Sequence, residues 1–233
     1  MSFDLLAPHY RWLEWVLAGG KLQRCRTAHI DVIPEPRQAL LVGEGNGRLL
    51  CQLAARFPRT RFTCVDASAK MLRAAKNRLQ LRGLGGTSVE FIHADILDWE
   101  PDGSFDLIVT HFFLDCFQPE QLARIVPRLA AAAAPGANWL VADFREPQSG
   151  WRKWRARLVL KSMYLFFQAV TRLPARSLAS PDPLLKQSGF MLARRSIFEW
   201  GLLHSDLWLL DGSPLKRQVH DSRMAFSQGA LAG

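Results

Sequence analysis

The sequence predicts an α/β fold with a doubly wound, mostly parallel sheet of seven strands that ends in an antiparallel hairpin. Five short apolar runs bounded by turn residues alternate with helix-like stretches, which is the order of elements in a parallel sheet. Two more β-like runs follow one another directly and are joined through Gly201. The predicted strands lie at 39–42, 61–65, 89–93, 105–109, 139–144, 191–200 and 202–210.

Helix-like stretches precede and separate these strands. An amphipathic stretch covers residues 3–22 at the start of the chain. After the second strand, Ser68 can cap a helix with four apolar side chains on one face: Met71, Leu72, Ala75 and Leu79. The pattern at 121–134 predicts another helix that includes an alanine run, and Pro127 is expected to kink or split it.

The chain of 233 residues suits one domain with additions. We expect an N-terminal helical cap over 1–30, a main domain over 31–210 and a loose C-terminal tail over 211–233. The main domain includes a helical lid insertion over 147–178, in which aromatic and basic residues are mixed. Such a segment could cover an active site, lie on an anionic membrane face, contact RNA or simply pack with a solvated face.

The net charge of +9 favours phosphate-rich or other anionic partners, but it does not choose among nucleic acid, membrane and cofactor. The four cysteines form no C-x-x-C pair, so we expect buried reduced thiols and no metal site. Asp4 and Glu14 interrupt the first apolar stretch, which does not fit a secretory signal. The longest apolar region, 158–170, is too short to span a bilayer, and we expect a cytoplasmic protein.

A glycine-rich turn follows the first strand, at Gly43, Gly45 and Gly47, and leads into a helical pattern. Glycines let backbone amides approach a ligand closely at a helix N-terminus. The dinucleotide fingerprint would need a third glycine at Arg48, so the spacing is G-x-G-x-G instead. The second strand ends in Asp66, about where such folds place an acid on the ribose hydroxyls. Together these features predict a nucleotide-like site.

Four segments in the right order resemble the successive motifs of class I S-adenosylmethionine-dependent methyltransferases, which have a Rossmann-like fold. They lie at 39–47, 65–72, 93–96 and 105–109, and Pro135-Gly136 before the fifth strand adds to the match. The similarity spans about residues 3–144. The opening segment, 3–10, further resembles the small-molecule branch that includes ubiquinone and menaquinone methyltransferases.

The resemblance implies S-adenosylmethionine as cofactor and eight residues that contact it: Gly43, Glu44, Gly45, Gly47, Asp66, Ala67, Asp95 and Ile96. The glycines would lie against the methionine portion, Asp66 on the ribose and Asp95 on the adenine amino group. Asp95 could equally cap the turn before Trp99.

The chain departs from the family at Leu41, where many members carry an acid that anchors the cofactor's ammonium group. Glu44, set between the glycines, could replace that acid. Alternatively, Glu44 points to solvent and backbone carbonyls hold the ammonium group. The departure also keeps open a degenerate relative with little or no cofactor binding.

The segment after the fourth strand is expected to meet the acceptor. His111 and Asp115 are the candidate catalytic residues, although His111 could be structural and Asp115 could cap the helix near Pro119. If the acceptor is a hydroxyl, His111 would take its proton, and the rate would fall as the imidazole titrates. We expect three further residues to bind the acceptor: Tyr10, Phe112 and Arg145.

The sequence therefore predicts a methyltransferase that moves a methyl group from S-adenosylmethionine to a small, lipophilic acceptor by in-line displacement. A peripheral contact with an anionic membrane is a further expectation, and nucleic acid is not an expected partner. Two alternatives stay open at this point. One is a degenerate, non-catalytic binding or membrane-associated protein, and the other is a nicotinamide-dependent oxidoreductase, which Arg48 and the lack of a Tyr-x-x-x-Lys pair disfavour.

Overall fold

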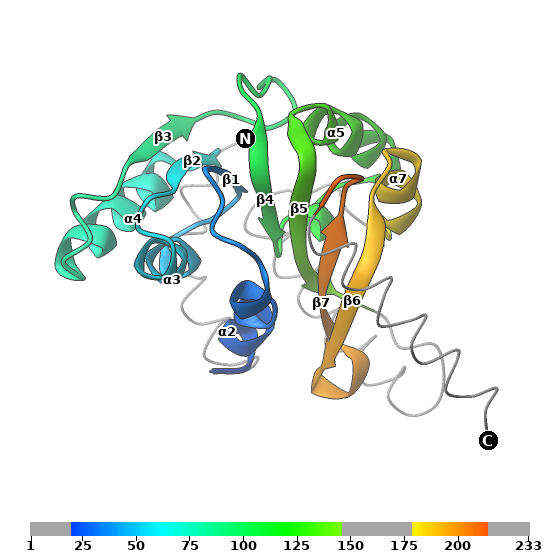
Figure 1. Cartoon of the computed structure of the whole chain (residues 1–233), viewed down its shortest axis with the longest axis horizontal. Coiled ribbons are helices and arrows are strands. Elements are labelled where there is room, and N and C mark those ends of the chain that lie inside the picture. Colours follow the sequence, from blue (N-terminus) through cyan, green and yellow to red (C-terminus); the bar gives the residue numbers. More distant parts are fainter. Residues whose placement is uncertain (1–19, 146–178, 214–233) are drawn as a thin grey trace, which may run out of the picture.

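A computed structural model describes residues 20–145 and 179–213, which form one seven-stranded sheet with helices on both faces (Figure 1). The strand order is β3-β2-β1-β4-β5-β7-β6. The first five strands pair in parallel, whereas β7 runs antiparallel to both β5 and β6. The strands are β1 (Gln38–Val42), β2 (Arg61–Asp66), β3 (Val89–His93), β4 (Phe105–His111), β5 (Ala133–Phe144), β6 (Met191–Phe198) and β7 (Leu203–Leu209). The predicted fold class and the final hairpin are confirmed.

The helices pack their apolar faces on this sheet. They are α2 (Gly20–Thr27), α3 (Arg48–Arg56), α4 (Ala69–Leu81), α5 (Pro119–Ala131) and α7 (Asp182–Gln187), with short 3-10 turns at Ile30–Val32, Leu114–Cys116 and Glu199–Gly201. Ser68 caps α4 as expected, because its hydroxyl accepts the Met71 N–H at 3.2 Å. The predicted apolar face of α4 is buried as well.

Two expectations about the alanine run and its helix are wrong. The helix ends at Ala131, and Ala133 and Ala134 instead begin β5, where Ala133 pairs with Phe105. Pairing with β4 overrides the helix propensity of alanine. Pro127 does not split α5, which runs through it without a break.

Pro135-Gly136 also lies inside β5 rather than before it. The register against β4 shifts between Phe105 and Leu107, and Gly136 adopts a φ of 79° that other residues rarely accept. Its N–H donates to the Asp211 carbonyl at 2.9 Å, and an added Cβ would lie 2.8 Å from the Gly212 carbonyl oxygen. This glycine lets the segment after β7 pack against the start of β5.

The core lies on both faces of the sheet because successive strand residues point to opposite sides. Leu41 and Val109 pack with α3 on one face, and Leu40 and Trp139 pack with α5 and α7 on the other. A third, smaller cluster lies under α2 and contains Leu22, Cys25, Phe112, Ala142 and Leu203. Burying one Leu side chain fully contributes about 2 kcal/mol, so both faces matter for stability.

The cysteine expectation is partly testable in the described residues. All four thiols are free, and Cys25, Cys51 and Cys64 are buried while Cys116 is half-buried. No group of three or more His, Cys, Asp or Glu side chains within 20–145 and 179–213 is arranged to hold a metal ion. None of the helices described is long and apolar enough to cross a membrane.

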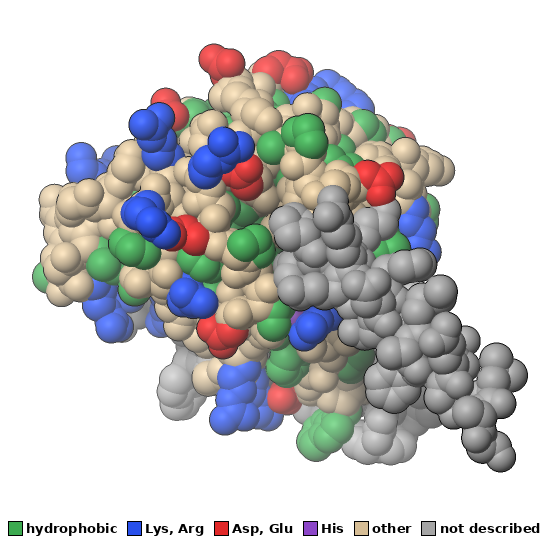
Figure 2. Space-filling model, viewed as in Figure 1, with side chains coloured by type: hydrophobic (Ala, Val, Ile, Leu, Met, Phe, Trp, Pro, Cys, Tyr) green, Lys and Arg blue, Asp and Glu red, His purple; other side chains and the backbone are tan. Residues whose placement is uncertain are grey.

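The lid at 147–178 and most of the N-terminal cap and C-terminal tail lie outside the described residues. On the face shown in Figure 2, Lys and Arg side chains are spread widely, with Asp and Glu side chains among them. The described part of this face therefore shows no single basic patch of the kind that a nucleic-acid site would present.

Candidate functional site

The parallel strands bring the predicted site residues to one edge of the sheet. Val42 at the end of β1 pairs with Val65 and with Thr110, and Asp66 at the end of β2 pairs with His93. The residues that follow these strands therefore share the carboxyl edge, which is where ligands bind in doubly wound sheets (Figure 1).

The three glycines of the turn have different surroundings, although all have φ between 68° and 79°. An added Cβ at Gly43 would overlap the ring of Phe113, and one at Gly47 would lie 2.7 Å from the Cα of Ala75 in α4. A Cβ at Gly45 would meet no atom of residues 20–145 and 179–213 within 4 Å. Gly43 and Gly47 are thus required by packing, whereas Gly45 leaves its backbone open to a ligand.

Asp66 ties this turn to the end of β2. Its Oδ2 accepts the Gly45 N–H at 3.0 Å, and its Oδ1 accepts the Ser68 N–H at 2.8 Å. The carbonyl of the next residue, Ala67, lies 3.1 Å from Nε2 of His93. Each carboxylate oxygen has two lone pairs, so a carboxylate can accept bonds from backbone N–H groups and from hydroxyl groups at the same time.

Glu44 points inward and not to solvent. Its Oε1 accepts the N–H groups of Leu49 and Leu50, each at 2.9 Å, in the first turn of α3. Gly47 has no side chain to cap this helix, so Glu44 supplies the missing acceptor. Burial, opposed by these two bonds, raises the pKa of Glu44 to about 7.

Asp95 shapes the turn that follows β3. Its Oδ1 accepts the Leu97 N–H at 3.0 Å, and its carbonyl accepts the N–H groups of Asp98 and Trp99, also at 3.0 Å. Ile96 is buried against α5, and the Arg128 guanidinium donates to its carbonyl at 3.0 Å. The turn role of Asp95 is therefore present in the structure, and its adenine role stays a prediction.

His111 is buried at the end of β4, and neither ring nitrogen has a hydrogen-bond partner among the residues that the structure describes. Burial, with smaller effects from Arg26 and His29, lowers the pKa of His111 to about 3. The imidazole is therefore neutral throughout the physiological range, and the expected loss of rate on its titration would not occur near neutral pH. Its two orphaned nitrogens leave one donor and one acceptor for a ligand.

Phe112 belongs to the small cluster under α2. Its φ is 53°, its ring lies 5.0 Å beneath the Arg26 guanidinium, and it meets Phe144 edge-on at 5.5 Å. The Arg145 N–H donates to the Leu202 carbonyl at 2.7 Å. Tyr10 lies outside the described residues. The acceptor-binding role of all three stays a prediction.

Asp115 is buried in the 3-10 turn after β4 and does not cap α5, because Gln118 and Gln121 form the capping box of that helix. Burial raises the pKa of Asp115 to about 6, although hydrogen bonds from Cys116 and the Phe144 backbone oppose this. His111 follows Val109 on the α3 side of the sheet, whereas Asp115 lies near β5 residues of the other side. The two candidate catalytic residues do not form a pair.

The comparisons with known proteins agree with this arrangement. A family model described as a methyltransferase domain matches residues 39–136. The demethylmenaquinone methyltransferase of Thermus thermophilus is 31% identical over 151 residues, which are 64% of this chain and 66% of that protein. The chain is therefore similar to class I methyltransferases in both sequence and fold. The resemblance seen in its motifs is thereby confirmed.

A second relative of this chain has a different named substrate from the first. The trans-aconitate 2-methyltransferase of Paracidovorax citrulli is 36% identical over 122 residues, which are 49% of this chain and 43% of that protein. The chain thus spans about two thirds of the first relative and less than half of the second. These two relatives are methyltransferases and give the nicotinamide alternative no support.

Solved structures share the fold of this chain. The mitomycin 7-O-methyltransferase MmcR has a TM-score of 0.64 at 21% identity, and the match covers 90% of this chain and 61% of that one. The N-methyltransferase NodS of Bradyrhizobium japonicum, solved with S-adenosylhomocysteine, has a TM-score of 0.57 at 15% identity, with 81% and 83% covered. Members of this family use S-adenosylmethionine as their methyl donor.

Sequence reasoning missed Asp143, which is 2% exposed near the end of β5. Its Oδ1 accepts the Phe113 N–H at 3.1 Å, and its Oδ2 is buried without a partner. Burial and the nearby Asp115 carboxyl raise the pKa of Asp143 well above its usual range. The signal was present, because Asp143 is the one charged residue in the apolar run 139–144.

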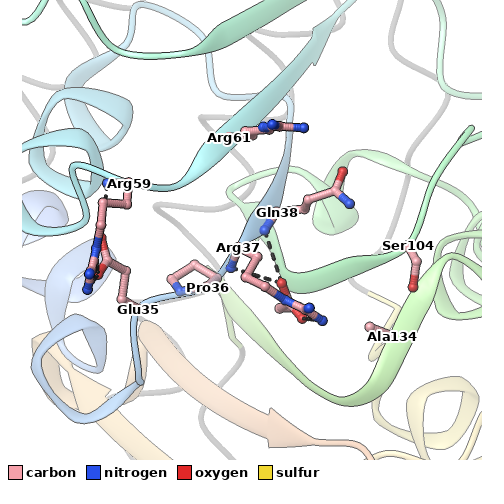
Figure 3. A pocket seen from close by; sticks show the side chains of 9 residues that line it. Glu35, Pro36, Arg37, Gln38, Arg59, Arg61, Ser104 and Ala134 are labelled. Carbon is pink, nitrogen blue, oxygen red and sulfur yellow. Dashed lines mark hydrogen bonds and ion pairs between the residues drawn. The ribbon is translucent and has the colours of Figure 1, made fainter.

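A cavity of about 580 Å³ lies at the opposite edge of the sheet and is separate from this site (Figure 3). Its lining includes the starts of β1 and β2, at Gln38 and Arg61. Asp106 accepts the Arg37 and Gln38 N–H groups at 2.9 and 3.0 Å, and Glu35 pairs with a largely exposed Arg59. Both acidic side chains of this cavity therefore have structural partners, which explain their presence without a ligand.

Proposed function

We propose that this protein transfers a methyl group from S-adenosylmethionine to a nucleophilic atom of a small, lipophilic acceptor. One observation carries the proposal: the open backbone of Gly45 is bonded to Asp66 at the carboxyl edge, in a chain that is similar to class I methyltransferases. A glycine with open space beside its Cα, next to an acceptor of ribose hydroxyls, is the combination that a nucleoside with an amino-acid tail requires.

The residues present fit this cofactor. Asp66 would accept the ribose hydroxyls, Asp95 the adenine amino group, and the turn at 43–47 would hold the methionine portion. Leu41 is 1% exposed in the sheet and has no polar atom, so it cannot bind the ammonium group. Glu44 follows Leu41 closely in the sequence, and an adjacent ammonium ion would favour the charged form of the Glu44 carboxyl.

Bound at this edge, S-adenosylmethionine would supply a methyl group on a positively charged sulfur, ready for in-line attack. The chain would then contribute position and the exclusion of water. His111, neutral and without internal partners, would donate or accept one hydrogen bond with the acceptor. Asp115 would accept a proton where the acceptor must lose one, because a carboxyl with a pKa of about 6 is mostly ionised at neutral pH.

A lipophilic acceptor is supported by the apolar surroundings of the loop after β4. Phe112 packs with Phe144, and Phe113 packs edge-on with Phe117 at 5.0 Å. The named relatives act on demethylmenaquinone in one case and on trans-aconitate in the other, and the aromatic side chains favour the first kind of acceptor. A contact of the basic lid with an anionic membrane would deliver such an acceptor, and it remains part of the proposal.

The test is a transfer assay with methyl-labelled S-adenosylmethionine and two probes, 1-naphthol and trans-aconitate. Label should enter the naphthol, and S-adenosylhomocysteine should raise the melting temperature of the protein. Asp66→Ala should abolish that shift, while Asp98→Ala, an exposed acid on the neighbouring loop, should keep it. Stabilisation by NADH and by neither sulfur nucleoside at millimolar concentration would refute the proposal.

A further inference from the structure

A second group of buried charges lies where β5 and β7 pair. Asp143 stands directly opposite His204, and Asp206 follows His204 by two residues on β7. Because directly paired residues and residues two apart share one face of a sheet, the three side chains lie on the same side. Their exposed fractions are 2%, 6% and 0%. With Asp115 they form what we call the carboxyl cluster.

Within the carboxyl cluster, Asp206 carries a negative charge that Arg195 stabilises. Arg195 of β6 donates to Asp206 through Nε at 2.8 Å and through Nη2 at 2.6 Å. The same guanidinium binds Asp182 of α7 at 2.8 Å. Burial alone would raise the pKa of Asp206, but the bonds from Arg195, together with the His204 imidazole beside it, bring this pKa below its usual value. Asp206 is therefore a carboxylate at neutral pH.

Asp206 in turn positions His204. The Nδ1 atom of His204 lies 3.0 Å from Oδ2 of Asp206, although the N–H direction is not well aligned for a hydrogen bond. The Cys25 thiol donates to the His204 carbonyl at 3.2 Å and fixes its backbone. A positive charge on His204 would favour the ionised form of Asp115.

Asp115 and Asp143 are the members of the carboxyl cluster that lie toward the glycine turn. Two neighbouring carboxyl groups in a buried place do not both ionise easily, so the pair retains a proton at neutral pH. Asp143 also accepts the Phe113 N–H, and the Phe113 ring covers Gly43. A single residue, Phe113, thus links the carboxyl cluster to the glycine turn of the cofactor site.

We propose that Asp143 and His204 are positioning residues for proton removal by Asp115. Asp206 holds His204, His204 favours the charged form of Asp115, and Asp143 fixes the loop that carries Asp115 beside the glycine turn. The inference rests on the proposed function and extends it to acceptors with a hydroxyl group.

Methyl transfer to a hydroxyl group needs only the acceptor, S-adenosylmethionine and Asp115 as the proton acceptor. A bond forms between the acceptor oxygen and the methyl carbon, and the carbon–sulfur bond breaks with its electron pair going to sulfur. The hydroxyl proton goes to Asp115 and is later released to solvent. The groups that face Asp115 and set this exchange are Cys116 on its own turn, Asp143 and the Phe144 backbone on β5, and His204 on β7.

The experiment compares four variants of the full chain with 1-naphthol as acceptor: His204→Gln, Asp143→Ala, Asp143→Asn and His29→Gln. His204→Gln should lower kcat about 10- to 100-fold, less than the loss of the acid or base itself, because Asp115 is kept, and it should leave the KM for S-adenosylmethionine unchanged. The acidic limb of its pH profile should move to higher pH, because a positive neighbour of Asp115 is lost. Asp143→Ala should lower kcat, and Asp143→Asn should restore most of it through a retained bond to the Phe113 N–H.

His29→Gln is the matched control. His29 is also buried, and its Nε2 lies 3.0 Å from the carbonyl of Ser205, the residue next to His204. This variant should lose comparable stability while kcat and the pH limb stay as in the wild type. An unshifted limb in His204→Gln, or equal loss of kcat in Asp143→Asn and Asp143→Ala, would overturn the inference.

A second readout does not depend on turnover. Carboxyl carbon NMR of the full chain should show Asp115 titrating at higher pH in His204→Gln than in the wild type. If the wild type methylates no probe, the proposed function fails, and the NMR titration still decides whether His204 acts on Asp115. An unchanged Asp115 titration would refute the inference in either case.

Discussion

The glycine turn at 43–47 and the carboxyl cluster lie at the same edge of the sheet but are built differently. The turn is a local structure: Glu44 accepts two backbone N–H groups from the first turn of α3, and the Gly45 N–H donates to the Asp66 carboxylate at the end of the next strand. The carboxyl cluster draws its side chains from β5, β7 and the turn after β4, and Arg195 of β6 completes it. The proposed cofactor half of the site thus depends on backbone shape, and the proposed acceptor half on buried charge.

Changes in the glycine turn should therefore act through sterics, and Gly47→Ala should have the largest effect on stability. Its Cβ would lie 2.7 Å from the α4 backbone at a φ of 79°, and overpacking with strain costs about 3 kcal/mol. Urea denaturation measures this loss. Gly83→Ala is the control, because Gly83 has a φ of 70° and open space around it, and it should lose about 1 kcal/mol.

Gly45→Ala separates ligand binding from packing in the same turn. Since Gly45 has open space like Gly83, the two variants should lose similar stability. Gly45→Ala should also weaken S-adenosylhomocysteine binding about 10-fold or more by calorimetry, because the added methyl group fills space that the ligand needs. Unchanged affinity would mean that the cofactor does not approach this glycine.

Removing the buried acid of the turn should cost less than Gly47→Ala. Glu44→Ala loses the cap of α3 and should lower the free energy of unfolding by about 1–2 kcal/mol. Glu44→Gln keeps one acceptor and tests the charge. Between about pH 4.5 and 7 the folded state binds more protons at Glu44 than the unfolded state, so its contribution to stability falls as pH rises. Glu44→Gln should therefore gain stability relative to the wild type from pH 5 to pH 8, and a constant difference would contradict the raised pKa.

The smallest expected effect is that of His111→Phe on stability. Replacing two unpartnered buried nitrogens with an apolar ring of similar shape should raise the free energy of unfolding by about 1 kcal/mol at pH 7. Because the folded pKa of His111 is lowered, the wild type loses stability as pH falls below about 6.5, and the variant should not share this loss. Thermal melts at pH 5 and pH 7 measure both effects, and a less stable variant would show that His111 has a structural partner.

Much of the fold was predictable because its signals are local. The alternation of apolar runs with helical patterns, the Ser68 cap and the G-x-G-x-G turn depend on residues within one element or its boundary. The prediction that Gly45 and Asp66 serve one site needed only the rule that parallel strands end at the same edge. The end of the alanine helix was missed because sheet pairing at Ala133 overrides local propensity.

By itself, the sequence determined the resemblance to methyltransferases, the parallel sheet with its final hairpin, and the place of the glycine turn that we propose for the cofactor. Only the tertiary structure decided that Glu44 caps α3, that His111 is buried without partners on the opposite face from Asp115, and that Asp143 faces His204. Periodicity and turn chemistry act over a few residues, whereas the pairing of Asp143 with His204 depends on a register between strands about 60 residues apart. The charges that would serve the acceptor are therefore visible only once that register is known.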